Sequence, residues 1–298
     1  MKAKKKRLRL KRQVVTSIPV IITVIILAIF LSVNKSDLST KEISLNDNIT
    51  ETNFISDYEN SMYLKFIDNA ISNRQRENTI IYYAEKYHLN SNNVLDIVKK
   101  LTNNFTDEKY LSTYAIGNIE EKFTNEEAGI VYFVRDLSRY PNKYGVSEKD
   151  IKVNTAVERD KKYENGTIIL QSGLTYEQFL GHICDLYGLD KNIVLAISYL
   201  ESGYLKSYLA SYKNNFGGQR SGGVWLEYPT PEAGIIGHVM TIRALVNGYN
   251  IDLTKPTGIS ELSAIYVYGN PNKPSESWTS KVSYLTEQNK TKELFLSE

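Results

Sequence analysis

The chain has 298 residues, enough for one or two domains with buried cores, and a net charge of only +2. The first 12 residues hold eight Lys or Arg and no acidic residue, which leaves 28 basic against 34 acidic residues in the remainder. The positive charge is therefore one short terminal block. This excludes a generally basic, nucleic-acid-binding protein.

An apolar segment follows the basic block. The 20 residues from Val14 to Val33, VVTSIPVIITVIILAIFLSV, contain no charged side chain. A helix of this length spans about 30 Å, the thickness of a bilayer's hydrocarbon core. We expect a cytoplasmic basic segment over residues 1–12 and a transmembrane helix over residues 13–33 that acts as an uncleaved signal-anchor. A cleaved signal peptide is the alternative, but its apolar region is usually shorter and ends at a small-residue cleavage site.

This topology predicts a single-pass protein of the cell membrane, with everything after Asn34 outside the cell. Residues 34–57 are polar and lack periodicity, which is typical of a stalk. Residues 58–165 contain amphipathic patterns at 78–89, 91–101 and 124–141, the last beginning with a capping-box pair, Thr124 and Glu127. They predict a helical domain of unknown role, with another envelope protein as a candidate partner. A charged connector over residues 142–170 includes one short strand at GTIIL.

Residues 166–298 form the second predicted domain, which is mainly α with one small β-hairpin. The hairpin strand is VWLEY, and two late helices are expected near residues 259–268 and 278–287. The helix-boundary signals are the capping-box pair Thr175 and Gln178, the N-cap Asp190, the cap Thr230 with Pro231 and Glu232 in the first turn, and Gly248 just past a helix end.

The sequence offers no metal or cofactor site. His88, His182 and His238 are scattered without ligand spacing, and there is no phosphate-binding glycine motif. Cys184 falls on an apolar helix face, which favours a small core residue over a nucleophile. We therefore expect no cofactor.

Glu201 is the candidate catalytic residue. It follows Val194, Ile197 and Leu200 at helical spacing, so it shares the face that points into the protein. Partial desolvation raises the pKa of a carboxyl group, and a protonated carboxyl can serve as a general acid toward a glycosidic oxygen. The alternative is a Glu paired with a Lys or Arg, or one that caps a neighbouring backbone.

The residues around Glu201 resemble the signature of a known family. Glu201-Ser202-Gly203, the step Ser207 to Ala210 and the turn Asn214 to Gly218 are similar to the motifs of bacterial N-acetylglucosaminidases of glycoside hydrolase family 73. These belong to the lysozyme-like peptidoglycan hydrolases. The resemblance implies a lysozyme-like helical domain with a β-hairpin lobe and Glu201 as catalytic acid.

A second, looser match covers AIYVYGNPNKPSESWTSKVSYL. It places Tyr266 at the family's active-site tyrosine, and Tyr268-Gly269 also resembles a segment of soluble lytic transglycosylases. The loop and its aromatic neighbours, whose faces can stack on sugars, give a candidate substrate-binding set: Ser202, Asn214, Asn215, Phe216, Gly217, Tyr228, Tyr268 and Trp278.

The resemblance implies a membrane-anchored endo-β-N-acetylglucosaminidase that cleaves the β-1,4 glycan strand of peptidoglycan. Glu227, in the predicted hairpin, is the candidate second acid; Glu232 is its rival, although a first-turn position already explains it. Attack by the substrate's own N-acetyl oxygen is a third route. A lytic transglycosylase that forms 1,6-anhydro ends, and a non-catalytic wall-binding scaffold, remain as alternatives.

Overall fold

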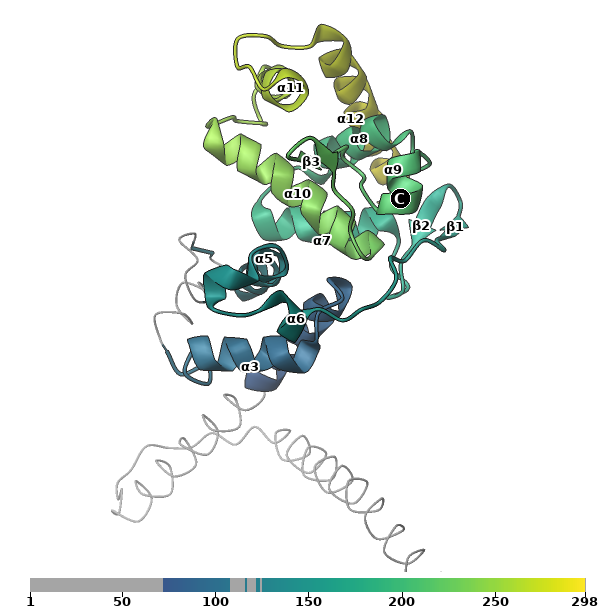
Figure 1. Ribbon diagram of the computed structural model, residues 1–298. Coiled ribbons are helices and arrows are strands. Elements are labelled where there is room, and N and C mark those ends of the chain that lie inside the picture. The colour runs from purple at the N-terminus through teal and green to yellow at the C-terminus, as the bar shows by residue number, and fades with distance from the viewer. Residues whose placement is uncertain (1–71, 108–115, 117–121, 124, 298) are drawn as a thin grey trace, which may run out of the picture. The chain divides into compact units, whose positions relative to one another are not determined.

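The computed structural model describes residues 72–107, 116, 122–123 and 125–297, which belong to a compact unit over residues 64–298 (Figure 1). The predicted transmembrane helix at 13–33 and the stalk at 34–57 lie outside these residues. Within the described ranges, no helix is both long enough and apolar enough to cross a membrane.

The first part of the unit is helical, as predicted. A helix over residues 72–86 is followed by α3 (Ser91–Leu101), α5 (Glu126–Arg139), the 3₁₀ turn η1 (Pro141–Tyr144) and α6 (Glu148–Ile151). Helix α5 begins after Asn125, whose side chain accepts a hydrogen bond from the Ala128 amide. The N-cap is therefore Asn125, one residue beyond the predicted Thr124, which lies outside the described residues.

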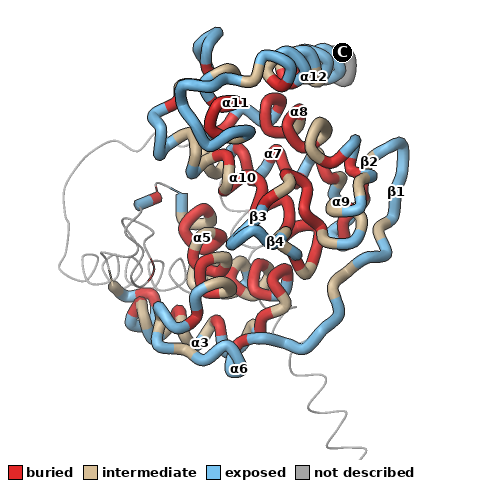
Figure 2. Tube along the Cα trace, turned by 45° about the horizontal axis from the view of Figure 1, so that its top comes forward, coloured by how far each residue is buried: buried red, intermediate tan, exposed pale blue. Residues whose placement is uncertain are grey.

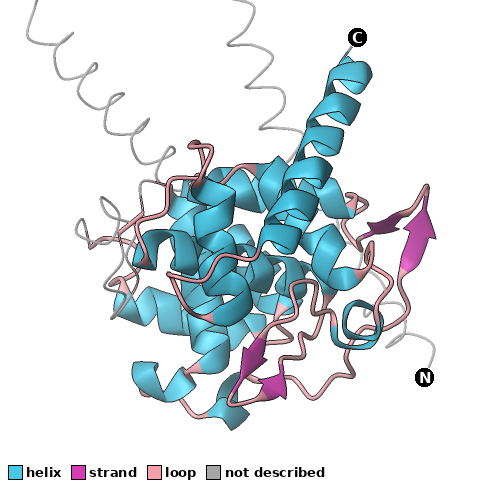
Figure 3. Cartoon of the chain, turned by 90° about the horizontal axis from the view of Figure 1, so that it is seen from above, coloured by secondary structure: helices cyan, strands magenta, loops and turns pink. Residues whose placement is uncertain are grey.

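The second part is also mainly helical and carries two small antiparallel hairpins (Figure 3). One hairpin is the predicted one at VWLEY. Of the other, only the strand at 166–170 was predicted. The elements, in chain order, are β1 (Lys162–Glu164), β2 (Thr167–Ile169), α7 (Tyr176–Tyr187), α8 (Lys191–Ser202), α9 (Tyr208–Lys213), β3 (Arg220–Ser221), β4 (Val224–Trp225), α10 (Pro231–Gly248), α11 (Gly258–Tyr268) and α12 (Glu276–Ser297).

Most predicted helix boundaries are confirmed, because capping depends on local sequence. Thr175 and Gln178 form the reciprocal capping box of α7, and the Asp190 side chain accepts hydrogen bonds from the first amides of α8. One boundary was wrong by a residue: Gly248 is the last residue of α10, and Tyr249 is its C-cap. Helix α12 also runs ten residues beyond the predicted end at 287.

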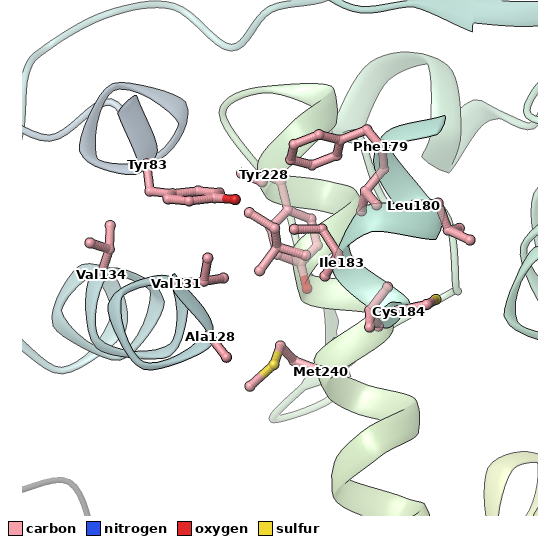
Figure 4. Packing of buried hydrophobic residues seen from close by; sticks show 14 of the residues in the cluster. Tyr83, Ala128, Val131, Val134, Phe179, Leu180, Ile183, Cys184, Tyr228 and Met240 are labelled. Atoms are coloured by element: carbon pink, nitrogen blue, oxygen red, sulfur yellow. The ribbon is translucent and has the colours of Figure 1, made fainter. Parts of the chain in front are cut away.

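One hydrophobic core runs through both parts (Figure 2). Figure 4 shows Ala128 and Val131 of α5 facing Ile183 of α7 and Met240 of α10, and all four side chains are buried. Cys184 is buried in the same cluster, as predicted. The domain boundary at residue 165 stays a prediction, but the two parts it separates are packed on a shared core.

Polar contacts also join the two parts. The Lys86 ammonium lies 3.1 Å from a carboxylate oxygen of Glu232, and the Tyr187 hydroxyl donates to the Ala128 carbonyl at 2.8 Å. Glu232 is fully buried, so its charge is balanced by a lysine from the first part of the unit. Glu232 thus has two structural roles: it lies in the first turn of α10, and it forms the ion pair with Lys86.

Candidate active site

Glu201 lies in the last turn of α8, one residue before the last residue of the helix, Ser202. The helix ends at Ser202, and its C-cap Gly203 has the left-handed conformation (φ 56°) that glycine adopts most readily. Val194 and Ile197 on the same face are fully buried, whereas Glu201 is half-buried. The helix therefore carries a carboxylate from the core to the edge of solvent.

The Glu201 carboxylate has a hydrogen-bond donor on α12 and a glycine of the following loop beside it. The Trp278 indole N–H, on α12, donates a hydrogen bond to Oε1 at 2.8 Å. Gly218 lies beside Oε2, since a Cβ built on Gly218 would be 3.6 Å from that oxygen. Within the described ranges no Lys, Arg or His forms an ion pair with Glu201. The geometry therefore differs from the alternative in which Glu201 is paired with a Lys or Arg.

The environment of Glu201 favours its protonated form. Burial raises the pKa of the carboxyl group above its ordinary value, and the hydrogen bond from Trp278 opposes the rise only in part. A carboxylic acid that keeps its proton closer to neutral pH is suited to general acid catalysis. The chemistry that the site can perform is therefore proton donation to a leaving-group oxygen.

Tyr266 lies between Trp278, the partner of Glu201, and the loop that follows α9. Its hydroxyl donates to the Gly217 carbonyl at 2.6 Å, and its ring lies 5.5 Å from the Trp278 ring, centroid to centroid. Burial raises the pKa of Tyr266, and the Glu201 charge raises it further. Tyr266 is thus a neutral phenol that anchors the loop next to the acid.

Two buried amides give the loop its shape. The Asn214 side-chain amide donates to the carbonyls of Glu158 and Tyr228, at 3.0 and 2.9 Å. The Asn215 amide donates to the carbonyls of Gln219 and Leu226, and its oxygen accepts from the Gln219 amide. Asn215 therefore closes the loop across the base of the β3–β4 hairpin.

Ser202 and Phe216 are also buried. The Ser202 hydroxyl donates to the Ser198 carbonyl and accepts from the Leu205 amide. The Phe216 ring meets the Tyr176 ring edge-on, with centroids 4.8 Å apart. Their predicted contacts with substrate stay predictions; what the structure gives them is the positioning of α8 and of the loop.

His238 lies under the loop, and sequence reasoning gave it no role. A Cβ at Gly217 would be 2.1 Å from His238 Nδ1, so the backbone passes directly over the ring. His238 is fully buried on α10, and burial lowers its pKa to about 4. The imidazole is therefore neutral, and the loop packs against it at Gly217. Only its place after the Ala-Gly-Ile-Ile-Gly run of α10 could have indicated this.

Tyr228 and Tyr268 differ in exposure. The Tyr228 ring is buried, with its hydroxyl accepting from the Arg139 guanidinium at 3.0 Å. Tyr268, at the end of α11, is half exposed, and the Lys273 ammonium lies 4.7 Å from its ring centroid. The exposed face of Tyr268 leaves it available to a sugar, whereas Tyr228 packs into the core.

Glu227 follows β4 and is partly exposed between two cations. Arg159 lies 3.6 Å from one carboxylate oxygen, and Lys213 lies 3.4 Å from the other. Glu227 and Glu201 thus occupy contrasting environments. Among the described residues no cluster of three or more His, Cys, Asp or Glu could hold a metal ion.

Comparison with known proteins adds one match. Residues 178–291 match the family model Glucosaminidase, described as mannosyl-glycoprotein endo-beta-N-acetylglucosaminidase. The match contains Glu201, Tyr266, Trp278 and the whole loop, and it leaves out the first helical part. Neither the curated proteins nor the solved structures gave a match.

Proposed function

Residues 178–291 form a glucosaminidase domain of glycoside hydrolase family 73, which makes the protein a glycoside hydrolase, and we propose that it cleaves the glycan strand of peptidoglycan from a membrane anchor. The proposed activity is that of an endo-β-N-acetylglucosaminidase on β-1,4 bonds. The predicted helix at 13–33 would hold the catalytic domain outside the cell, against its polymeric substrate. The mainly helical fold with small two-stranded hairpins fits this proposal.

The catalytic acid in this proposal is Glu201. The single observation that carries it is a half-buried carboxyl with a raised pKa, held by a neutral indole donor instead of a cation. In its protonated form it donates the proton to the glycosidic oxygen as the bond to the anomeric carbon breaks. The Trp278 N–H then stabilises the carboxylate that remains.

The second role, stabilisation or attack at the anomeric carbon, has two candidates. Glu227 is held between Arg159 and Lys213, and a carboxylate there could activate water. The substrate's own N-acetyl oxygen is the other candidate. It is favoured by the absence, in the described part of the chain, of an acidic side chain close enough to Glu201 to shift its pKa. Glu227 is supported by its place two residues after β4, in the hairpin whose base borders Glu201.

The test is digestion of purified peptidoglycan by the full-length protein, beside Glu201→Gln, with mass spectrometry of the products. Reducing N-acetylglucosamine ends support the proposal, and 1,6-anhydro ends would assign a lytic transglycosylase instead. Glu201→Gln should lower turnover by about three orders of magnitude or more while the fold is retained. Full turnover by this variant would overturn the role of Glu201, and absence of cleavage by the wild type would favour a wall-binding scaffold.

A further inference from the structure

A cavity of about 570 Å³ lies between the first helical part and the β3–β4 hairpin. Its walls come from the segment after the 72–86 helix, the C-terminal end of α5, residues 152–157 and the chain around β3 and β4. The family match does not cover the first three of these segments. The cavity is therefore built jointly by the glucosaminidase domain and by the part of the chain that precedes it.

The hairpin connects this cavity to Glu201. At its base, Gly218 lies beside the Glu201 carboxylate, and a Cβ on Gly218 would be 3.8 Å from Trp225. Further along, Ser221 and Leu226 line the cavity. The β3–β4 hairpin thus borders both the Glu201 site and the cavity. A polymer bound along the hairpin would reach both sites.

Arg139 gives the cavity its chemical character. It uses one N–H to bond the Tyr228 hydroxyl, and within the described ranges no carboxylate lies within ion-pair distance of it. A guanidinium has five N–H donors, so a fork remains for a bidentate anion.

Neighbouring cations, by contrast, are paired. Lys152, also at the wall, bonds Glu148. Among the described residues that line the cavity, the one acid is Glu227, which is held by Arg159 and Lys213.

The rim carries an aromatic side chain as well. Tyr140, next to Arg139, lines the cavity and is 58% exposed. An exposed ring beside a guanidinium suits a ligand with both an apolar and an anionic part. The repeating sugars of the glycan do not combine an apolar group with a free anion as well as the attached peptides do. These short peptides carry free carboxylates and methyl groups.

We propose that this cavity is a substrate subsite that takes a carboxylate-bearing peptide of the glycan strand, with Arg139 as the residue that binds the carboxylate. The inference rests on the proposed peptidoglycan hydrolase function. It gives the first helical part a role that the family match leaves open, that of a wall of the substrate cleft. The enzyme then selects peptide-substituted stretches of the strand.

The experiment compares kcat/KM of the full-length protein on wall glycan that keeps its peptides and on the same glycan after amidase removal of the peptides. Both are first stripped of phosphate-containing wall polymers. The wild type should prefer the peptide-bearing glycan about 10-fold, and Arg139→Gln should reduce this preference to near 1, since a charge-assisted hydrogen-bonded pair contributes on the order of a factor of ten or more.

Arg74→Gln, on the exposed face of the 72–86 helix, removes the same charge elsewhere and should keep the preference. Arg139→Lys provides a second variant if Arg139→Gln does not fold: it keeps the positive charge but loses the guanidinium fork, and it should reduce the preference several-fold. Thermal unfolding checks each variant.

Three outcomes are decisive. Equal rates of the wild type on both glycans, unchanged in both cavity variants, would overturn the subsite while leaving the hydrolase intact. A preference that appears only when phosphate-containing polymers are retained would assign the cavity to phosphate and overturn the peptide. Absence of cleavage of every glycan by the wild type would instead overturn the hydrolase itself.

Discussion

The Trp278 indole donates its hydrogen bond to the Glu201 carboxylate across 77 residues of sequence. Helix α12, which carries Trp278, makes its most extensive packing contact with α8, which carries Glu201. The hydrogen bond is therefore held by the packing of two whole helices. A fixed donor of this kind controls both the direction and the acidity of the carboxyl group.

Trp278→Phe should move the pH dependence of the reaction. The indole N–H stabilises the ionised carboxylate and so lowers the Glu201 pKa. Without it, burial acts alone, the pKa rises, and the protonated acid persists to higher pH. We expect the alkaline limb of kcat/KM against pH to shift upward, so that the ratio of variant to wild-type rate increases with pH.

The rate at the optimum should fall several-fold, because the carboxyl loses its fixed direction. Tyr266→Phe is the control, since it removes a hydrogen bond to the Gly217 carbonyl but none to Glu201. The role of the Trp278 hydrogen bond would be contradicted if the alkaline limb of kcat/KM moved to lower pH in Trp278→Phe. It would also be contradicted if the limb moved by the same amount in Trp278→Phe and Tyr266→Phe.

Gly217→Ala should displace the loop beside the acid. The added Cβ would meet His238 Nδ1 at 2.1 Å and the Tyr266 hydroxyl at 3.0 Å, and both belong to packed elements. We expect a loss of about 1–3 kcal/mol in the free energy of unfolding, as for other overpacked sites, and a fall in kcat of at least about 10-fold. Urea denaturation and turnover measure the two effects.

Gly222→Ala is the matched comparison at the tip of the same hairpin. Nothing lies within 4 Å of its Cβ, and only its positive φ of 56° opposes the substitution. Its cost should be about 1 kcal/mol, from backbone strain alone, with turnover preserved. Similar turnover in the two variants would show that the loop over His238 does not position the site.

Local sequence rules predicted the parts of the fold that depend on neighbouring residues. Thr175, Asp190 and Thr230 were identified as caps because the amides they bind lie two or three residues away. Glu201 was identified because helix periodicity placed it on the buried face. In each case the physical cause and the sequence signal lie within one or two turns of helix.

Long-range partners could not be predicted in the same way. The sugar contacts expected of Asn214 and Asn215 stay predictions, and the sequence did not indicate that their buried amides bond four backbone carbonyls. An amide has the same sequence signature in either role. His238 carried only the weak signal of its place after the Ala-Gly-Ile-Ile-Gly run, because its packing depends on Gly217, 21 residues earlier, crossing its ring.

The buried ion pair between Lys86 and Glu232 should be strongly coupled. The side chains are 10% and 0% exposed, so removal of either one leaves a buried charge without its partner. Glu232→Gln and Lys86→Met should each cost about 3–5 kcal/mol in the free energy of unfolding. The double variant should cost clearly less than the sum, and equilibrium denaturation of all four proteins measures the coupling. Additive costs would mean that the two charges do not depend on each other.

The contact between His182 and Glu127 should make stability depend on pH. The two side chains are 2.8 Å apart. The hydrogen bond to Glu127 raises the His182 pKa above its ordinary 6.5. For Glu127, burial alone would raise the pKa, but hydrogen bonds from His182 and Tyr83 bring it below its ordinary value. The pair is thus fully charged between the two pKa values.

Because the folded-state pKa of His182 is raised, its stabilisation is complete below pH 6.5 and is lost as pH rises through the folded value. The difference in unfolding free energy between wild type and His182→Gln should therefore be larger at about pH 5.5 than at about pH 8.5. His88→Gln should show the opposite trend, since burial lowers the His88 pKa. Urea denaturation at the two pH values measures both differences, and a His182 contribution that grows with pH would contradict the charged contact.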